Sequence, residues 1–457
     1  TVSALSLNAV LDMDMVSEGF LNTLQKSLQA GKVSMAAIDA ACKRILDAKY
    51  DLGLFEDPFK YLKLERSSEV LSVDKRAFAK EAAMRSFVLL KNDNQVLPLK
   101  SNQKIALIGP LANDRSNMPG TWSINADAKQ AISVLEGLNN RPGIGSKILY
   151  AKGANISDDP VFAAKINVFG EKISIDTRSP QELIAEALTV AAASDVIVAV
   201  VGEASEMSGE AASRTSLDIP ASQQKLIEAL SKTGKPLVLV LMNGRPLTIA
   251  NELKSATAVL DVWHAGTEAG NAVAAVLYGD YNPAGKLTMS FPRNVGQIPI
   301  YYSVRNTGRP NGGDVFGKYR SNYLDVENSP LLPFGYGLSY TTFSYGKPVL
   351  SAPTLTATKA ITASVTLTNS GNYDGEEVVQ LYIKDDVASI TRPLKELKGF
   401  QKVFLKKGET KTVTFTIDES LLRFYNADLK HISEKGNFQL YIGSNAAIEN
   451  GVLFQLK

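Results

Sequence analysis

Hydrophobic positions along this chain follow two different rhythms, which change near residue 344. Between residues 75 and 300, short apolar runs alternate with stretches whose apolar residues recur at helical spacing. Strands that alternate with helices are typical of a largely parallel sheet with helices on both faces, so we predict an α/β sandwich domain over residues 75–300. The predicted strands are 104–109, 146–152, 196–201, 236–242 and 258–263, and the predicted helices are 75–86, 180–193, 221–231 and 266–278.

From residue 344 onward, apolar and polar side chains alternate with a period of two. The alternation is clearest in ITASVTLTNSG (361–371), EEVVQLYIKD (376–385), TKTVTFTID (410–418) and GNFQLYIGS (436–444). Short alternating strands separated by Gly, Asn and Lys turns indicate a β-sandwich of the immunoglobulin or fibronectin type III kind. We therefore predict a fibronectin type III-like domain over residues 344–457, with residues 301–343 as a connecting segment.

The N-terminal region has a different pattern. An apolar run over residues 5–15 predicts a strand, and amphipathic patterns over 17–29 and 34–50 predict two helices. One strand and two helices cannot bury a core of their own, so residues 1–57 are expected to be the tail of a larger domain. The polar stretch over residues 58–74 is expected to be a linker.

Composition narrows the range of partners. The 457 residues correspond to about three domains, and 49 basic side chains against 47 acidic ones give a net charge of +2. This balance argues against nucleic acid or an anionic membrane as the main partner, and no apolar run approaches a membrane span. The single cysteine, Cys42, excludes an internal disulfide. Two distant histidines, His264 and His431, make a zinc site unlikely, and we expect neither metal nor cofactor.

The strongest candidate for chemistry is the loop that follows the predicted strand 196–201. It carries Glu203, Glu206, Glu210 and Arg214, and Glu206 is expected to face solvent. Ligands of open α/β sheets bind outside the carboxyl ends of the strands, so a carboxylate on this loop is well placed to meet a substrate. Glycine-rich turns after the strands also allow a rival hypothesis of phosphate binding, but neither nucleotide-binding glycine motif is present.

Several long motifs in one order resemble glycoside hydrolase family 3. They are GEASEMSGEAASRT (202–215), KPLVLVLMNGRPL (235–247), HAGTEAGNAVAAVLYGDYNPAGKL (264–287), SFPR (290–293) and LPFGYGLSYTTF (332–343). The resemblance implies a (β/α)8-like barrel, of which residues 1–57 are the tail, followed by the α/β sandwich and the fibronectin type III-like domain. It also implies a retaining, exo-acting β-glucosidase that is periplasmic or secreted.

The resemblance assigns roles to particular residues. A retaining glycosidase needs two carboxyl groups about 5 Å apart. The family's acid/base glutamate corresponds to Glu210, whereas its nucleophilic aspartate has no counterpart in this chain. The barrel portion of the same protein is thus an expected partner, beside β-linked glucosides and a possible second copy. Trp122, in a G-x-W context, is expected to form a wall of the leaving-group sugar subsite.

Other residues and functions stay open at this point. Glu203 is the second choice for catalysis, and it either contacts substrate or anchors the loop. Arg214 either binds sugar or orients a loop carboxylate, and His264 is expected to be structural. The alternatives to a β-glucosidase are a β-xylosidase or β-N-acetylglucosaminidase of the same family, or a non-catalytic carbohydrate-binding fragment.

Overall fold

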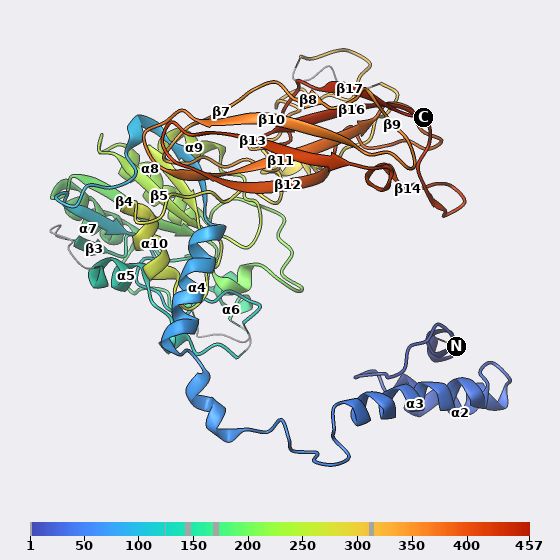
Figure 1. Cartoon of the computed structure of the whole chain (residues 1–457). Helices are drawn as coiled ribbons and strands as arrows, with labels where there is room; N and C mark the ends of the chain where they lie inside the picture. The colour runs from blue at the N-terminus through green and yellow to red at the C-terminus, as the bar shows by residue number, and fades with distance from the viewer. Residues whose placement is uncertain (1, 124, 142–147, 168–172, 310–314) are drawn as a thin grey trace. The chain divides into compact units, whose positions relative to one another are not determined.

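The computed structural model describes residues 2–123, 125–141, 148–167, 173–309 and 315–457, and it divides at residues 75 and 76 into two units (Figure 1). The described residues of the first unit contain three complete α-helices, one short 3-10 helix and the start of a further helix, Val73–Ser86. Ser34 caps the third helix, because its side chain accepts a hydrogen bond from Ala37 N. A small core of Ala4, Leu7, Val33 and Ala41 holds these helices together. The elements are α1 (Val2–Asn8), α2 (Gly19–Gln29), α3 (Met35–Asp51) and η1 (Leu64–Glu69).

The prediction of a strand over residues 5–15 is wrong. Residues 2–8 form helix α1, and residues 9–15 have no regular secondary structure. A strand needs a neighbour to pair its backbone N–H and C=O groups, and residues 2–75, all of which are described, contain no other strand. The two helices predicted after it are confirmed as α2 and α3.

The second unit begins with a six-stranded sheet in the order β1-β6-β5-β4-β2-β3. All neighbouring strands are parallel except β1, which pairs with β6 in the antiparallel sense. The predicted parallel strands are confirmed, but β1 was missed because it is short and directly follows a helix. The strands are β1 (Val88–Asn92), β2 (Ile105–Ile108), β3 (Ile148–Ala151), β4 (Val196–Gly202), β5 (Leu237–Met242) and β6 (Ala258–Asp261).

Helices cover both faces of this sheet, as the strand pattern predicts. Val198 and Val240 point to a core shared with α4, α5 and α10, whereas Ile197 and Leu239 point to a second core shared with α7 and α8. Because both faces of these strands are buried, nearly every residue in them is apolar. The helices are α4 (Val73–Ser86), α5 (Val134–Asn140), α6 (Pro160–Lys165), α7 (Pro180–Ala192), α8 (Ala221–Ser231), α9 (Ala250–Ser255) and α10 (Ala269–Leu277), with 3-10 turns η2 (Asp93–Gln95), η3 (Ala128–Gln130), η4 (Ser205–Met207) and η5 (Val295–Gln297).

A β-sandwich completes the second unit. One sheet runs β13-β10-β7 with β8 beside β10, the other runs β12-β11-β16-β17-β9, and β14 pairs with β15. Inward-facing residues such as Val365 and Leu381 form its core. The strands are β7 (Phe343–Tyr345), β8 (Val349–Leu350), β9 (Thr354–Leu355), β10 (Ile361–Asn369), β11 (Gly375–Asp385), β12 (Glu396–Leu405), β13 (Thr410–Ile417), β14 (Phe424–Tyr425), β15 (His431–Ile432), β16 (Gly436–Gly443) and β17 (Val452–Leu456), with η6 (Glu419–Leu422) between β13 and β14.

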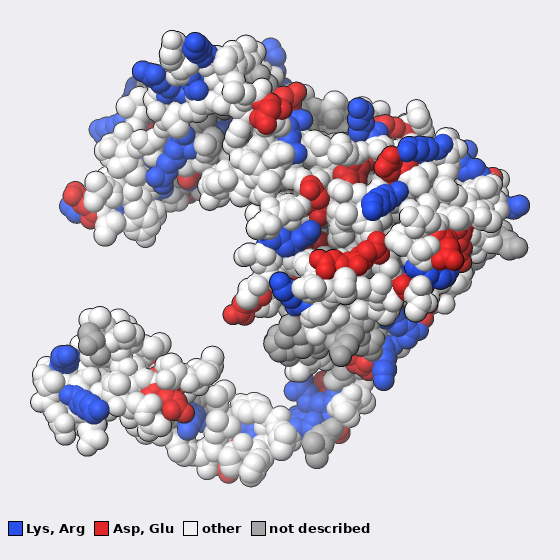
Figure 2. Space-filling model, turned by 180° about the vertical axis from the view of Figure 1, so that it is seen from behind, with Lys and Arg blue, Asp and Glu red and all other residues white. Residues whose placement is uncertain are grey.

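Specific polar contacts join the α/β part to the β-sandwich. Lys286 Nζ lies 3.0 Å from Glu377 Oε2 on β11, and Tyr281 OH donates to Glu376 Oε2 on the same strand at 3.2 Å. Side chains of both charge signs are visible on the surface in Figure 2, in keeping with the small net charge. Within the described residues, no helix has the length and apolar character that a bilayer crossing requires.

Candidate active site

The candidate site lies at the carboxyl edge of the parallel strands. The chain passes from β2 to β3 on one side of β2 and then returns to β4 on the other side. Loops that leave β2 and β4 therefore diverge, and such a switch point is where α/β sheets bind ligands. The loops after β2, β4, β5 and β6 all begin at this edge, and they carry Trp122, Glu203, Glu210, Arg214, Arg245 and His264.

The loop after β4 starts in a conformation that only glycine adopts easily. Gly202 has φ +131°, and a Cβ added there would lie 1.9 Å from the carbonyl oxygen of Met242 at the end of β5. The backbone N–H of Glu203 donates to the same carbonyl at 2.7 Å. The absence of a side chain at Gly202 thus lets the loop turn closely over β5.

Glu203 is the centre of a buried ion cluster. Its side chain is 0% exposed, and Oε1 lies 2.7 Å from Arg214 Nη1 and 3.3 Å from Arg245 Nε. Oε2 accepts a hydrogen bond from Gly244 N at 3.1 Å. The cluster ties the loop after β4 to the loop after β5. A fully buried carboxylate with these partners offers no surface to a ligand, so the geometry favours the anchoring role of Glu203 over substrate contact.

Arg214 belongs to the same buried ion cluster. Its Nη1 binds Glu203, and its Nη2 donates to the carbonyl of Asp218 at 2.9 Å. Both partners, Glu203 and Asp218, belong to the same loop as Arg214. The geometry therefore favours the alternative in which Arg214 orients a loop carboxylate, which here is Glu203.

Arg245 completes the cluster, and sequence analysis did not identify it. Its Nη2 donates to the carbonyl of Met207, and to that of Ala212 at 2.7 Å. These two carbonyls flank Gly209 and Glu210 in the sequence. The only sequence signal was the Asn-Gly-Arg-Pro turn after a predicted strand, which resembles an ordinary exposed turn. Arg245 instead holds both flanks of the turn that carries Glu210.

Glu210 is exposed on that turn, next to the loop that carries Trp122. Gly209 and Ala211, on either side of it, have φ +109° and +55°. A Cβ added at Gly209 would lie 2.5 Å from Thr121 Cγ2, so the two loops touch at this point. Trp122 follows Thr121 and is 74% exposed. The fold thereby brings together two residues that the sequence singled out separately.

A second anchor lies beneath the Trp122 loop. Asn117 Oδ1 accepts from Ser205 N at 2.8 Å, and Asn117 O lies 3.2 Å from His264 Nδ1. Burial lowers the pKa of His264 to about 4, and its Nε2 has no hydrogen-bond partner among the described residues. A neutral imidazole held by a backbone carbonyl fits the structural role predicted for His264. Glu206, predicted to face solvent, is half-buried.

The described part of the chain contains no group of three or more His, Cys, Asp and Glu side chains that could hold a metal ion. The candidate site is thus built from one exposed carboxylate, one exposed indole and the charged cluster behind them. Such a site can transfer a proton and stack against a ring.

Comparisons with known proteins identify the class. Residues 87–340 match the glycosyl hydrolase family 3 C-terminal domain, and residues 377–446 match a fibronectin type III-like domain. The first match spans more than half of the chain. The chain therefore belongs to glycosyl hydrolase family 3, and the predicted family and fold class are confirmed.

Individual relatives give more specific similarities than the family models do. The chain is 50% identical over 446 residues to a periplasmic beta-glucosidase of Salmonella typhimurium, which covers 97% of this chain and 58% of that protein. It is 40% identical to a beta-xylosidase of Formosa agariphila, over 98% of this chain and 60% of that protein. The crystal structure of a beta-glucosidase from Listeria innocua in complex with gluconolactone superposes with a TM-score of 0.88 at 35% identity, over 99% of this chain and 59% of that one. The chain thus spans about three fifths of the length of these relatives.

Proposed function

We propose that this chain is the acid/base-bearing portion of a retaining, exo-acting β-glucosidase. Glu210 is the general acid/base, and barrel sequence outside this chain supplies the nucleophilic aspartate. The observation that carries the proposal is the exposed Glu210 carboxyl on a turn that the Glu203–Arg245 cluster fixes on both flanks, beside the loop of Trp122. The 50% identical periplasmic beta-glucosidase of Salmonella typhimurium supports both this activity and a periplasmic location.

The proposed reaction has two steps. In the first, the aspartate attacks the anomeric carbon while Glu210 gives its proton to the leaving oxygen, so the glycosidic bond breaks and a glucosyl ester forms. In the second, the Glu210 carboxylate takes a proton from water as the water oxygen attacks the same carbon and frees the aspartate. Two inversions release β-D-glucose with its configuration retained. In this proposal, the exposed Trp122 stacks on the leaving-group sugar.

The test uses the full-length enzyme and the substitution Glu210→Ala. A 2,4-dinitrophenyl glucoside needs no proton for departure, so its first step should proceed almost normally. Cellobiose has a poor leaving group that needs this proton, so its hydrolysis should slow by about 10²- to 10⁴-fold. The second step then becomes slow, because no general base activates water. Azide needs no general base, so it should restore turnover of the 2,4-dinitrophenyl glucoside and yield β-glucosyl azide.

The matched control is Glu206→Ala, which removes a carboxylate from the same loop and should change neither substrate's rate in this selective way. Equal losses on both substrates, with no rescue by azide, would contradict the role of Glu210. If proton NMR shows α-glucose as the first product, the retaining mechanism is wrong.

A β-xylosidase is the second candidate, because the Formosa agariphila relative is 40% identical. The two activities differ by the substrate's C6 hydroxymethyl group. The ratio of kcat/KM for 4-nitrophenyl β-glucoside to that for the β-xyloside decides between them. A ratio above one supports the glucosidase, and a ratio below one supports the xylosidase.

A further inference from the structure

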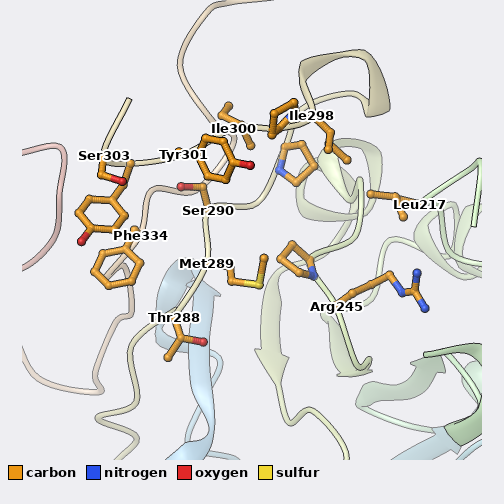
Figure 3. Close-up of a pocket in the computed structure, with 14 residues that line it drawn as sticks. Leu217, Arg245, Thr288, Met289, Ser290, Ile298, Ile300, Tyr301, Ser303 and Phe334 are labelled. Carbon is orange, nitrogen blue, oxygen red and sulfur yellow. The ribbon is translucent and has the colours of Figure 1, made fainter. Parts of the chain in front are cut away.

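An apolar groove of about 520 Å³ lies between residues 288–303 and the loops that follow β4 and β5 at the carboxyl edge of the sheet (Figure 3). Residues 288–303 supply most of its walls, among them Met289, Ile298 and Tyr301. Leu217 and Arg245 close it on the side of the sheet. Figure 3 shows the Met289 side chain between Arg245 and the aromatic side chains of Tyr301 and Phe334.

The chemistry of the groove fits a small apolar ligand. Met289 is 58% exposed, and Ile298 and Tyr301 are exposed as well. At one end, the rings of Tyr302 and Phe334 stack with centroids 4.2 Å apart. A few hydroxyl groups, including that of Ser290, interrupt an otherwise apolar surface. Concave sites with apolar and aromatic walls and few polar groups are typical of small-molecule binding.

Two residues that line the groove connect it to the loop of the candidate active site. Arg245 lines the groove, and its guanidinium binds the carbonyls of Met207 and Ala212 on either side of Glu210. Leu217 lines the groove as well, and its carbonyl accepts a hydrogen bond from Thr248 N at 3.0 Å. The loop that presents Glu210 therefore also supplies Leu217 to the wall of the groove.

We propose that this groove binds the apolar aglycone of the substrate, an alkyl or aryl group attached to the glycosidic oxygen. The inference rests on the proposed function, because the oxygen that Glu210 protonates belongs to the aglycone. In this proposal, a group that extends from this oxygen follows the loop from Glu210 to Leu217 and packs against Leu217, Met289 and Ile298. Burial of apolar surface then raises kcat/KM by up to about fourfold per buried methylene.

Alkyl β-glucosides test this in the full-length enzyme, because ethyl and octyl glucosides have leaving groups of similar basicity. We expect kcat/KM for octyl glucoside to exceed that for ethyl glucoside by at least about tenfold. Met289→Ser and Ile298→Ser should each reduce this octyl-to-ethyl ratio at least about threefold. The matched control is Leu453→Ser on β17, which removes an apolar side chain of similar exposure, 57%, outside the groove. Its ratio should equal that of the wild type.

A second measurement needs no hydrolysis and uses the 457-residue chain itself. With methionine methyl groups labelled by ¹³C, Met289→Leu assigns the Met289 resonance among the eight methionines. Octyl glucoside below its micelle concentration should shift this resonance, and glucose at the same concentration should not. The exposed Met13 in the first unit reports non-specific detergent contact.

Each outcome decides the proposal. An octyl-to-ethyl ratio near one in the wild type, or a ratio that the groove variants leave unchanged, overturns it. Losses shared equally by both glucosides show that another part of the protein fills the groove, and they overturn it too. A shift of Met289 by octyl glucoside in a protein that hydrolyses no glucoside would leave the groove standing as a binding site while the proposed function fails.

Discussion

At the scale of single residues, the site depends on how a buried carboxylate is neutralised. Glu203 is fully buried and contacts both Arg214 and Arg245. Removing one partner of a buried ion cluster leaves charge uncompensated, which costs more than the pair itself contributes. Arg245 also binds the carbonyls of Met207 and Ala212, so its loss should disturb the turn that carries Glu210. We therefore regard Arg245 as a positioning residue.

Replacing Arg245 by Met in the full-length enzyme should lower kcat for cellobiose by up to about 100-fold, because small displacements of a catalytic group are costly. The loss should be much smaller for the 2,4-dinitrophenyl glucoside, whose departure does not use the Glu210 proton. Arg293→Met is the control, since Arg293 binds Ser329 and Glu327 away from this loop. Equal losses on both substrates would indicate a general loss of folded enzyme instead.

At the scale of elements, the loops after β2 and β6 are held together through a neutral histidine. His264 follows β6, its Nδ1 lies 3.2 Å from the carbonyl of Asn117, and Gly120 packs against its Cβ. Because the acceptor is a carbonyl, Nδ1 carries the proton and Nε2 does not. Burial lowers the pKa of His264 to about 4, so protonation of Nε2 opposes the folded state.

This histidine predicts a pH dependence of stability. The unfolded chain, with a histidine pKa near 6.5, binds more protons than the folded chain between about pH 6.5 and pH 4. The stabilisation is therefore complete above pH 6.5 and is lost as the pH falls. Between pH 7.5 and pH 5, the wild type should lose about 2 kcal/mol more unfolding free energy than His264→Asn. Urea denaturation at both pH values measures the difference, and parallel losses in the two proteins would refute the assignment.

At the scale of the whole molecule, the α/β part and the β-sandwich of the second unit share a nearly buried ion pair. The side chains of Lys286 and Glu377 are 10% and 4% exposed, and Tyr345 OH donates to the other oxygen of Glu377 at 2.8 Å. Tyr281 and Asn282 add hydrogen bonds from the α/β part to Glu376 and Asp374. We expect residues 76–457 to unfold as one cooperative body.

Replacing Lys286 by Met leaves the Glu377 carboxylate without its cation and should cost about 3 to 5 kcal/mol. The double substitution Lys286→Met with Glu377→Gln should recover part of this loss, because it removes the buried charge. Lys232→Met breaks an exposed pair with Glu228 and should leave the urea midpoint unchanged. If Lys286→Met behaves like Lys232→Met, the pair does not hold the two parts together.

The sequence by itself determined the type and order of most elements in the second unit. A strand that is buried on both faces, such as 196–201, needs apolar side chains at every position. A strand that is buried on one face, such as 361–369, needs them at every second position, so both patterns specify strands. The ordered motifs also singled out Glu210, and the G-x-W context singled out Trp122, since each signal is carried by residues close in sequence. Strand β1 and the helix over residues 2–8 were missed, because short elements depend on what packs against them.

Only the tertiary structure decided which charges meet. Glu203, Glu206 and Glu210 lie within one loop and look alike in sequence, yet one is fully buried, one is half-buried and one is exposed. The difference comes from Arg245 and Gly244, which approach from another strand. Burial and ion pairing are set by long-range contacts, and these determine which carboxylate anchors the loop and which stays exposed.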